Sequence, residues 1–151
     1  MGYNRAMSSS FSRNMKLLGE ALNENAEKII REAAIAASGE AIQRTPVKTG
    51  KARINWKVSF GTFKPGERKG PDTGRAEANR QLASTEALIN AANRIKGWRI
   101  GSGSIIIGNS VGYIADLDRG TSRQAMAGMS KFAIAAAQDV LRKGKLLKKN
   151  G

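Results

Sequence analysis

The sequence predicts an α+β fold in which helices cover a small β-sheet. Two changes in the spacing of apolar residues support this prediction. Apolar residues recur every three or four positions over 14–44, alternate with polar residues over 52–60, and return to helical spacing from about 75 to 95. A chain of 151 residues is long enough for one domain with its own core. We therefore expect a single α+β domain over residues 14–142.

The first predicted element is a long N-terminal helix. Residues 1–13 are polar and rich in serine, which predicts a flexible N-terminal arm. The helical pattern then runs from about Asn14 to Arg44 in an alanine-rich stretch, and alanine has the highest helix propensity. Pro46 ends this helix and favours an extended conformation at Thr45. The predicted core-facing positions are Leu18, Leu22, Ile29, Ala33, Ala37 and Ala41.

The second predicted element is a strand over residues 52–60. Arg53 and Lys57 lie on its polar, basic face, and the alternation requires them to point away from the core. The opposite face carries the apolar residues Ala52, Ile54, Trp56, Val58 and Phe60. Residues 64–75 combine glycine, proline and basic residues, which predicts a mobile central loop that is basic and variable.

The remaining elements follow from the same two periods. A helix is predicted from about 75 to 95, and glycines at 97, 101 and 103 separate it from a buried strand over 104–109. Residues 111–117 fit a short helix or an irregular turn, and residues 120–128 fit a loop. A final helix is predicted from about Met129 to Leu141, followed by a mobile basic C-terminal tail over 143–151.

The composition limits the chemistry of the chain. The absence of His and Cys excludes disulfides, thiolate nucleophiles, Cys-based zinc sites and the commonest general base. The net charge is +14, and the cationic excess lies in residues 47–75 and 126–151. Such clusters bind polyanions through charge and counterion release, but a solvated basic surface or an acidic protein partner fits them too. No apolar run is long enough for a membrane span or a signal peptide, so we expect neither.

Several features could be taken for active sites. Residues 101–104 resemble a phosphate-binding loop but lack the Gly-Lys-Ser/Thr that should follow, so a turn is favoured. Asp116 and Asp118 could bind a metal, but without a third ligand nearby they fit a surface turn better. Trp56 is predicted to pack in the core, whereas Trp98 could pack there or stack on a base. We expect no enzymatic activity, no cofactor and no metal.

Three sequence blocks follow one another along the chain: residues 45–56 (TPVKTGKARINW), 105–114 (IIIGNSVGYI) and 117–129 (LDRGTSRQAMAGM). In this order and at compatible spacing, they resemble the tail-completion or minor tail (neck) proteins of tailed double-stranded-DNA bacteriophages. The sequence departs from the family pattern where Lys48 replaces Asp, Gly112 replaces Pro, Asp118 replaces Glu and Met126 replaces Pro. The resemblance extends over roughly residues 17–141.

The resemblance implies a structural virion protein of the head–tail connector. It would form a homo-oligomeric ring, expected to be a hexamer, that completes the tail end and joins it to the head. Its partners would be neighbouring connector, stopper, terminator or tail-tube proteins, and DNA passing nonspecifically through the channel. It would reside in the virion after assembly in the host cytoplasm. The alternatives are a tail terminator or other minor tail component, or a sequence-nonspecific nucleic-acid-binding protein.

We expect two groups of residues at a subunit interface or at the channel. The basic strand face and its surroundings would meet DNA or a neighbouring subunit. In residues 120–129, which Arg119 precedes, polar side chains would bind the next subunit and a methionine would fill its pocket, although a plain surface loop fits this segment as well. The candidate residues are Lys48, Lys51, Arg53, Lys57, Arg119, Arg123, Gln124 and Met126.

Overall fold

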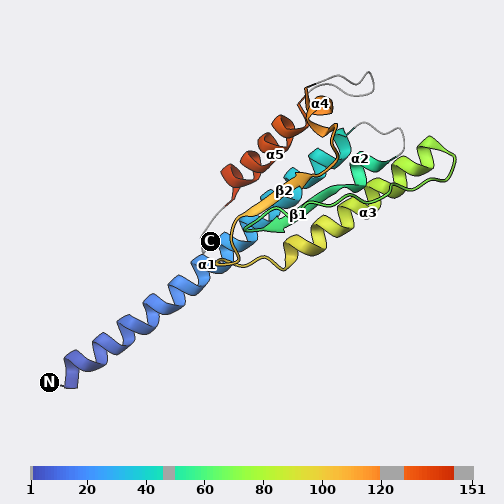
Figure 1. Cartoon of the computed structure of the whole chain (residues 1–151). Helices are drawn as coiled ribbons and strands as arrows, with labels where there is room; N and C mark the ends of the chain where they lie inside the picture. The colour runs from blue at the N-terminus through green and yellow to red at the C-terminus, as the bar shows by residue number, and fades with distance from the viewer. Residues whose placement is uncertain (1, 46–49, 120–127, 145–151) are drawn as a thin grey trace.

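The computed structural model describes residues 2–45, 50–119 and 128–144 and confirms the predicted α+β class. Five helices and two strands are present in these ranges, with one long helix running the length of the molecule (Figure 1). The elements in chain order are α1 (Gly2–Arg44), α2 (Lys51–Ile54), β1 (Trp56–Phe60), α3 (Ala76–Lys96), β2 (Ile105–Asn109), α4 (Ile114–Asp118) and α5 (Met129–Lys143).

Helix α1 begins at Gly2, so the prediction of a flexible arm over residues 1–13 is wrong for residues 2–13. No glycine or proline interrupts residues 3–18, and extending a helix costs far less free energy than nucleating one. Serine lowers helix propensity only modestly, so the serine-rich stretch does not end the helix. As a result, the N-terminal part of α1 projects beyond the rest of the fold (Figure 1).

The two strands form an antiparallel pair in which Trp56 lies opposite Asn109 and Phe60 lies opposite Ile105. Helix α1 runs behind this sheet, with α3 on the side of β1 and α5 packed along α1 (Figure 1). The core has two parts. Ala37, Ala41 and Ala133 form one cluster between α1 and α5, and Ile42, Ala87 and Ala91 form the other between α1 and α3. Trp56 packs against both clusters, which confirms its predicted place in the core.

Strand β1 begins at Trp56, not at Ala52, because residues 51–54 form the helical turn α2. The turn starts at Gly50, whose φ of +82° favours glycine. A Cβ at Gly50 would lie 3.0 Å from the Cβ of Ala83, so α3 also leaves no room for a side chain there. Asn55 ends the turn and is completely buried.

The turn directs Arg53 into the protein, so its predicted place on an outward basic face is wrong. Its side chain is buried and donates hydrogen bonds to the carbonyl oxygens of Gln43 (2.9 Å) and Thr45 (2.8 Å) and to Ser84 Oγ (2.6 Å). Burial lowers the pKa of the guanidinium, and the nearby charge of Arg80 lowers this pKa further. Arg53 thus joins the C-terminal end of α1 to α3.

Two buried asparagines, Asn55 at the end of α2 and Asn79 of α3, bind the central loop over residues 64–75 through hydrogen bonds. The Asn55 side chain donates to the carbonyl oxygen of Arg68 (2.8 Å) and accepts a hydrogen bond from the Arg68 backbone N–H (2.6 Å). Farther along, Asn79 Oδ1 accepts hydrogen bonds from the backbone N–H (2.9 Å) and the hydroxyl (2.8 Å) of Thr73. These contacts hold the middle of the loop at the end of α2 and its last part at α3.

Replacing the buried arginine should destabilise the fold. We expect Arg53→Ala to lower the free energy of unfolding by about 2–4 kcal/mol, because two carbonyl groups and one hydroxyl lose a buried donor. Chemical denaturation followed by circular dichroism measures this change. The control is Lys69→Ala, at an exposed position, which should change the stability by less than about 0.5 kcal/mol. Equal denaturation midpoints for the two variants would contradict the structural role of Arg53.

Candidate functional site

The structure separates the residues expected at an interface or channel. Lys51 begins α2 and forms an ion pair with Glu67 at 2.8 Å, and this hydrogen bond raises the pKa of Lys51. Arg119 follows α4 at an exposed position and pairs with Asp116. Lys57 lies in a groove with other cationic side chains. Four candidates lie outside the described residues: Lys48, Arg123, Gln124 and Met126.

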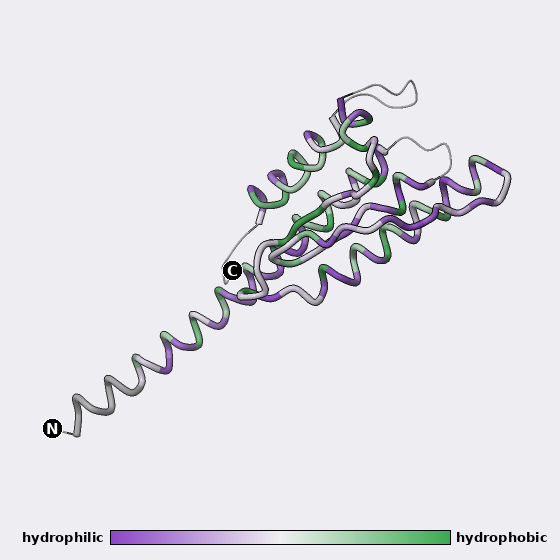
Figure 2. Tube along the Cα trace, in the orientation of Figure 1, coloured by the Kyte–Doolittle hydropathy of each residue, from purple (hydrophilic) through white to green (hydrophobic). Residues whose placement is uncertain are grey.

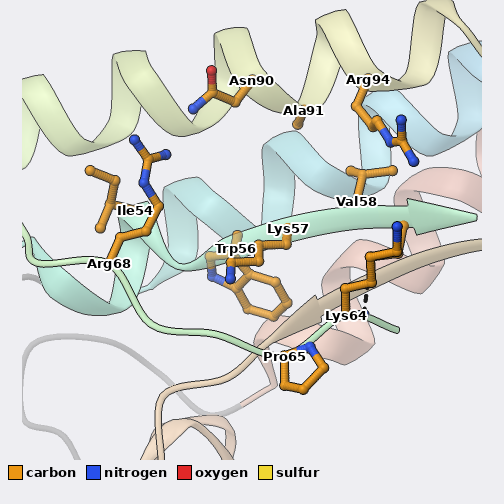
Figure 3. A pocket seen from close by; sticks show the side chains of 11 residues that line it. Ile54, Trp56, Lys57, Val58, Lys64, Pro65, Arg68, Asn90, Ala91 and Arg94 are labelled. Carbon is orange, nitrogen blue, oxygen red and sulfur yellow. Dashed lines mark hydrogen bonds between the residues drawn. The ribbon is translucent and has the colours of Figure 1, made fainter. Parts of the chain in front are cut away.

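A groove of about 450 Å³ lies between β1, the central loop and α3. We call it the cationic groove, because four of its lining residues are Lys57, Lys64, Arg68 and Arg94. Figure 3 shows Lys64 and Arg68 extending from the loop toward α3, and Arg94 extending from α3 toward β1. Apolar lining between these cations comes from Ile54, Trp56, Val58 and Ala91.

Specific contacts hold the cationic groups around the groove. Lys57 Nζ donates a hydrogen bond to the carbonyl oxygen of Gly66. The Arg94 guanidinium lies 4.4 Å from the centre of the Phe60 ring, a distance typical of a cation–π contact. The backbone N–H of Lys64 donates to Ser59 Oγ at 3.4 Å, which places Lys64 beside β1.

The groove has an uncompensated positive charge. None of its lining residues is acidic, and Arg68 is the one lining cation for which the described residues provide a carboxylate, that of Glu86. A concave surface with several cations raises the local concentration of anions. Its ammonium and guanidinium groups can also donate hydrogen bonds to phosphate or carboxylate oxygens. The arrangement can therefore hold an anionic group, and it needs no catalytic step to do so.

Sequence reasoning found one residue of this groove and missed the others. The alternation of residues 52–60 predicts an outward Lys57, and the composition of residues 64–75 predicts a basic loop. The loop has no period of its own, so the sequence did not show that Lys64 and Arg68 lie across β1. Arg94 lies on α3, and only the packing of α3 against β1 brings it to the same groove.

The features that resembled active sites have structural roles. Asp118 accepts hydrogen bonds from the backbone N–H (2.9 Å) and hydroxyl (2.6 Å) of Ser130 at the start of α5. Trp98 is buried, and its indole N–H donates to the carbonyl oxygen of Gly103 at 2.8 Å. Gly103 meets Gly61 so closely that a Cβ there would lie 2.9 Å from Gly61 Cα. Gly103 thus serves a close contact between two backbone segments, whereas Gly101 has a φ of +99°, which favours glycine.

Residues 2–45, 50–119 and 128–144 lack two further kinds of site. Within these ranges, no three His, Cys, Asp or Glu side chains gather closely enough to hold a metal ion. No helix in the same ranges combines the length and apolar character needed to cross a membrane.

Charge reversal in the groove should weaken the retention of the protein on a polyanion. We expect Lys64→Glu with Arg94→Glu to elute from a heparin column at lower salt than Arg13→Glu with Lys16→Glu. Both variants change the net charge equally, but only the first changes the cations that share one concave surface. Circular dichroism checks that both remain folded. Elution of both at the same salt concentration would show that the groove has no special role in anion binding.

A family model matches half of the chain. The model describes bacteriophage HK97-gp10-like tail components and matches residues 9–84. These residues include most of α1, all of α2 and β1, and the first part of α3, so the match contains the first of the three sequence blocks. Neither the curated proteins nor the solved structures contain a significant match. The chain belongs to the HK97-gp10-like family of bacteriophage tail components.

Proposed function

We propose that this structural tail component is a subunit of the phage neck. In this proposal, identical subunits form a closed ring, expected to be a hexamer, that completes the tail end and joins it to the head. The ring leaves a channel for DNA and contacts neighbouring connector, stopper, terminator or tail-tube proteins. The protein is assembled in the host cytoplasm and remains in the virion. The proposal assigns it no catalytic step.

The observation that supports this proposal is the exposed apolar surface on the projecting part of α1. Phe11, Met15 and Leu17 each expose half or more of their surface there, and Leu18 exposes 42%. Exposed apolar patches of this kind mark protein–protein contact surfaces. In a tail component, such a surface supports assembly with other copies or other tail proteins. A repeated head-to-tail contact of this type closes into a ring when its rotation permits.

The cationic groove supports a second part of the proposal. We assign it to sequence-independent contact with a polyanion, and DNA in the channel is the polyanion that a neck ring would meet. Lys57 is the residue of the predicted basic face that remains in this role, because Arg53 is buried. Contacts to phosphates position a protein without selecting a sequence.

A tail terminator is the alternative within the same structural class, and the two differ in the phenotype of a phage that lacks the protein. We expect a stop codon in this gene to give filled heads and separate tails of normal length, because a completion protein acts at the junction. Electron microscopy of the lysate measures both features. Overlong tails would instead indicate a terminator. Fully joined virions would contradict the neck assignment altogether.

A free nucleic-acid-binding protein is the alternative from another class, and the net charge of +14 is its motivation. We expect the isolated chain to bind double-stranded DNA weakly and with equal affinity for unrelated sequences. The affinity should fall steeply with salt, since binding releases counterions. Fluorescence anisotropy with two oligonucleotides over a range of salt concentrations measures these properties. Tight binding to one sequence at physiological salt would favour the alternative.

A further inference from the structure

One face of helix α1 is apolar along most of its length but is covered along only part of it. We call the residues Phe11, Met15, Leu18 and Leu22 the apolar stripe. Their spacing of four, three and four residues places them on one side of a helix. The same side continues into the body of the protein with Ile29 and the core alanines. Figure 2 shows hydrophobic residues recurring along the projecting part of α1.

The cover of this face stops where α5 ends. Gly144 follows α5 and packs so closely on Ile29 that a Cβ at Gly144 would lie 2.8 Å from Ile29 Cγ2. On the other side of α1, Glu27 accepts a hydrogen bond from the backbone N–H of Ile100 at 2.9 Å. The described residues provide no comparable contact for the apolar stripe, and Phe11 is 67% exposed.

The body carries an uncovered apolar surface of its own between α1 and α5. We call this the apolar slot; its volume is about 380 Å³. Its walls are alanines from both helices, and its other lining includes Trp56, Ile107 and the 57% exposed Ile134. Alanine walls admit large side chains from another helix. The slot is lined by Ala37, Ala41, Ala133 and Ala137, with Ser130 and Gln138 as uncharged polar residues.

We propose that the apolar stripe of one subunit docks into the apolar slot of the next subunit. Met15 and Ala37 lie on the same straight helix about 33 Å apart, so the stripe cannot reach the slot of its own chain. The occupant of the slot is therefore the stripe of a second copy. The residues beside the stripe, such as Ser12, Gly19 and Ala21, are small and uncharged. This chemistry matches the slot and does not suit a polyanion.

The docking gives the proposed ring a repeated contact, and the inference rests on that proposed function. Each copy provides one stripe and one slot, so the contact is heterologous and every copy can both donate and receive. Within one chain, apolar side chains already pack against the alanines of α1 and α5. The docked stripe would add further apolar side chains to the same alanines. Pairing between two projecting helices would leave the slots empty and would produce dimers.

Disulfide cross-linking tests this contact directly, because the chain has no cysteine. We expect Met15→Cys with Ile134→Cys, in one full-length chain, to form disulfide-linked dimers and larger species under mild oxidation. A disulfide requires Cα atoms about 4.4–6.8 Å apart, so the two positions cannot join within one chain. The matched control is Lys16→Cys with Ile134→Cys, since Lys16 lies beside Met15 in sequence but about 100° around the helix. Non-reducing gels should show cross-linked species for the first variant only.

The single-cysteine variants identify the partner surface. We expect Met15→Cys and Ile134→Cys to cross-link when mixed and not when oxidised separately. Dimers of Met15→Cys alone would show that two projecting helices pair, which would overturn the inference. Equal cross-linking of the Lys16 control would overturn it too.

A second measurement distinguishes failure of this inference from failure of the proposed function. Light scattering should show that wild-type oligomers are lost in the triple variant Phe11→Ser, Met15→Ser and Leu18→Ser while circular dichroism shows a folded body. Oligomers of unchanged mass in this variant would overturn the docking but not the ring. A monomeric wild-type chain, together with a Met15→Cys, Ile134→Cys variant that forms no cross-links, would also overturn the docking. The stop-codon phenotype would then decide the neck function independently.

Discussion

The buried hydrogen bonds around Thr45 hold the end of α1 to the elements that follow it. The Thr45 hydroxyl donates to the carbonyl oxygen of Ala41 at 2.6 Å and accepts from the indole N–H of Trp56 at 2.7 Å. The Thr45 carbonyl oxygen accepts from Arg53, which also binds α3 through Ser84. Met129 of α5 packs against the same hydroxyl, with its sulfur 3.3 Å away. One residue thus contacts α1, β1 and α5 directly, and α3 through Arg53.

This arrangement places Trp56 between two surfaces of different chemistry. One side of β1 contributes to the cationic groove with Lys57, and Trp56 also lines the apolar slot beside Ile107. Because both surfaces share this residue, the hydrogen bond from Trp56 to Thr45 sets the position of each relative to α1. In the proposed ring, the groove would serve the polyanion and the slot would serve the neighbouring subunit. A substitution at Trp56 would alter both and could not separate their roles.

The distribution of side-chain size is also relevant to assembly. Most of the buried apolar residues in the described ranges are alanines, which allow α1, α3 and α5 to approach closely but bury little apolar area each. Several larger side chains lie instead on exposed surfaces, including Phe11, Met15 and Ile134. Contacts between subunits would remove these larger groups from water. In the proposed ring, burial of large apolar side chains would therefore occur between subunits, whereas other proteins bury such side chains in the core of the monomer.

The sequence alone determined the α+β class, the helical and strand periods, the absence of cysteine and histidine chemistry, and the family resemblance. Each depends on local spacing or composition, which a single sequence displays. Tertiary structure decided the direction of Arg53: the alternation of residues 52–60 fits an outward basic face, whereas Gln43, Thr45 and Ser84 provide the buried acceptors. It also brought Lys64 and Arg94 to Lys57, and the slot walls to one another. Arg94 is distant from Lys57 along the chain, as Ala133 is from Ala37, and only packing free energy brings such residues together.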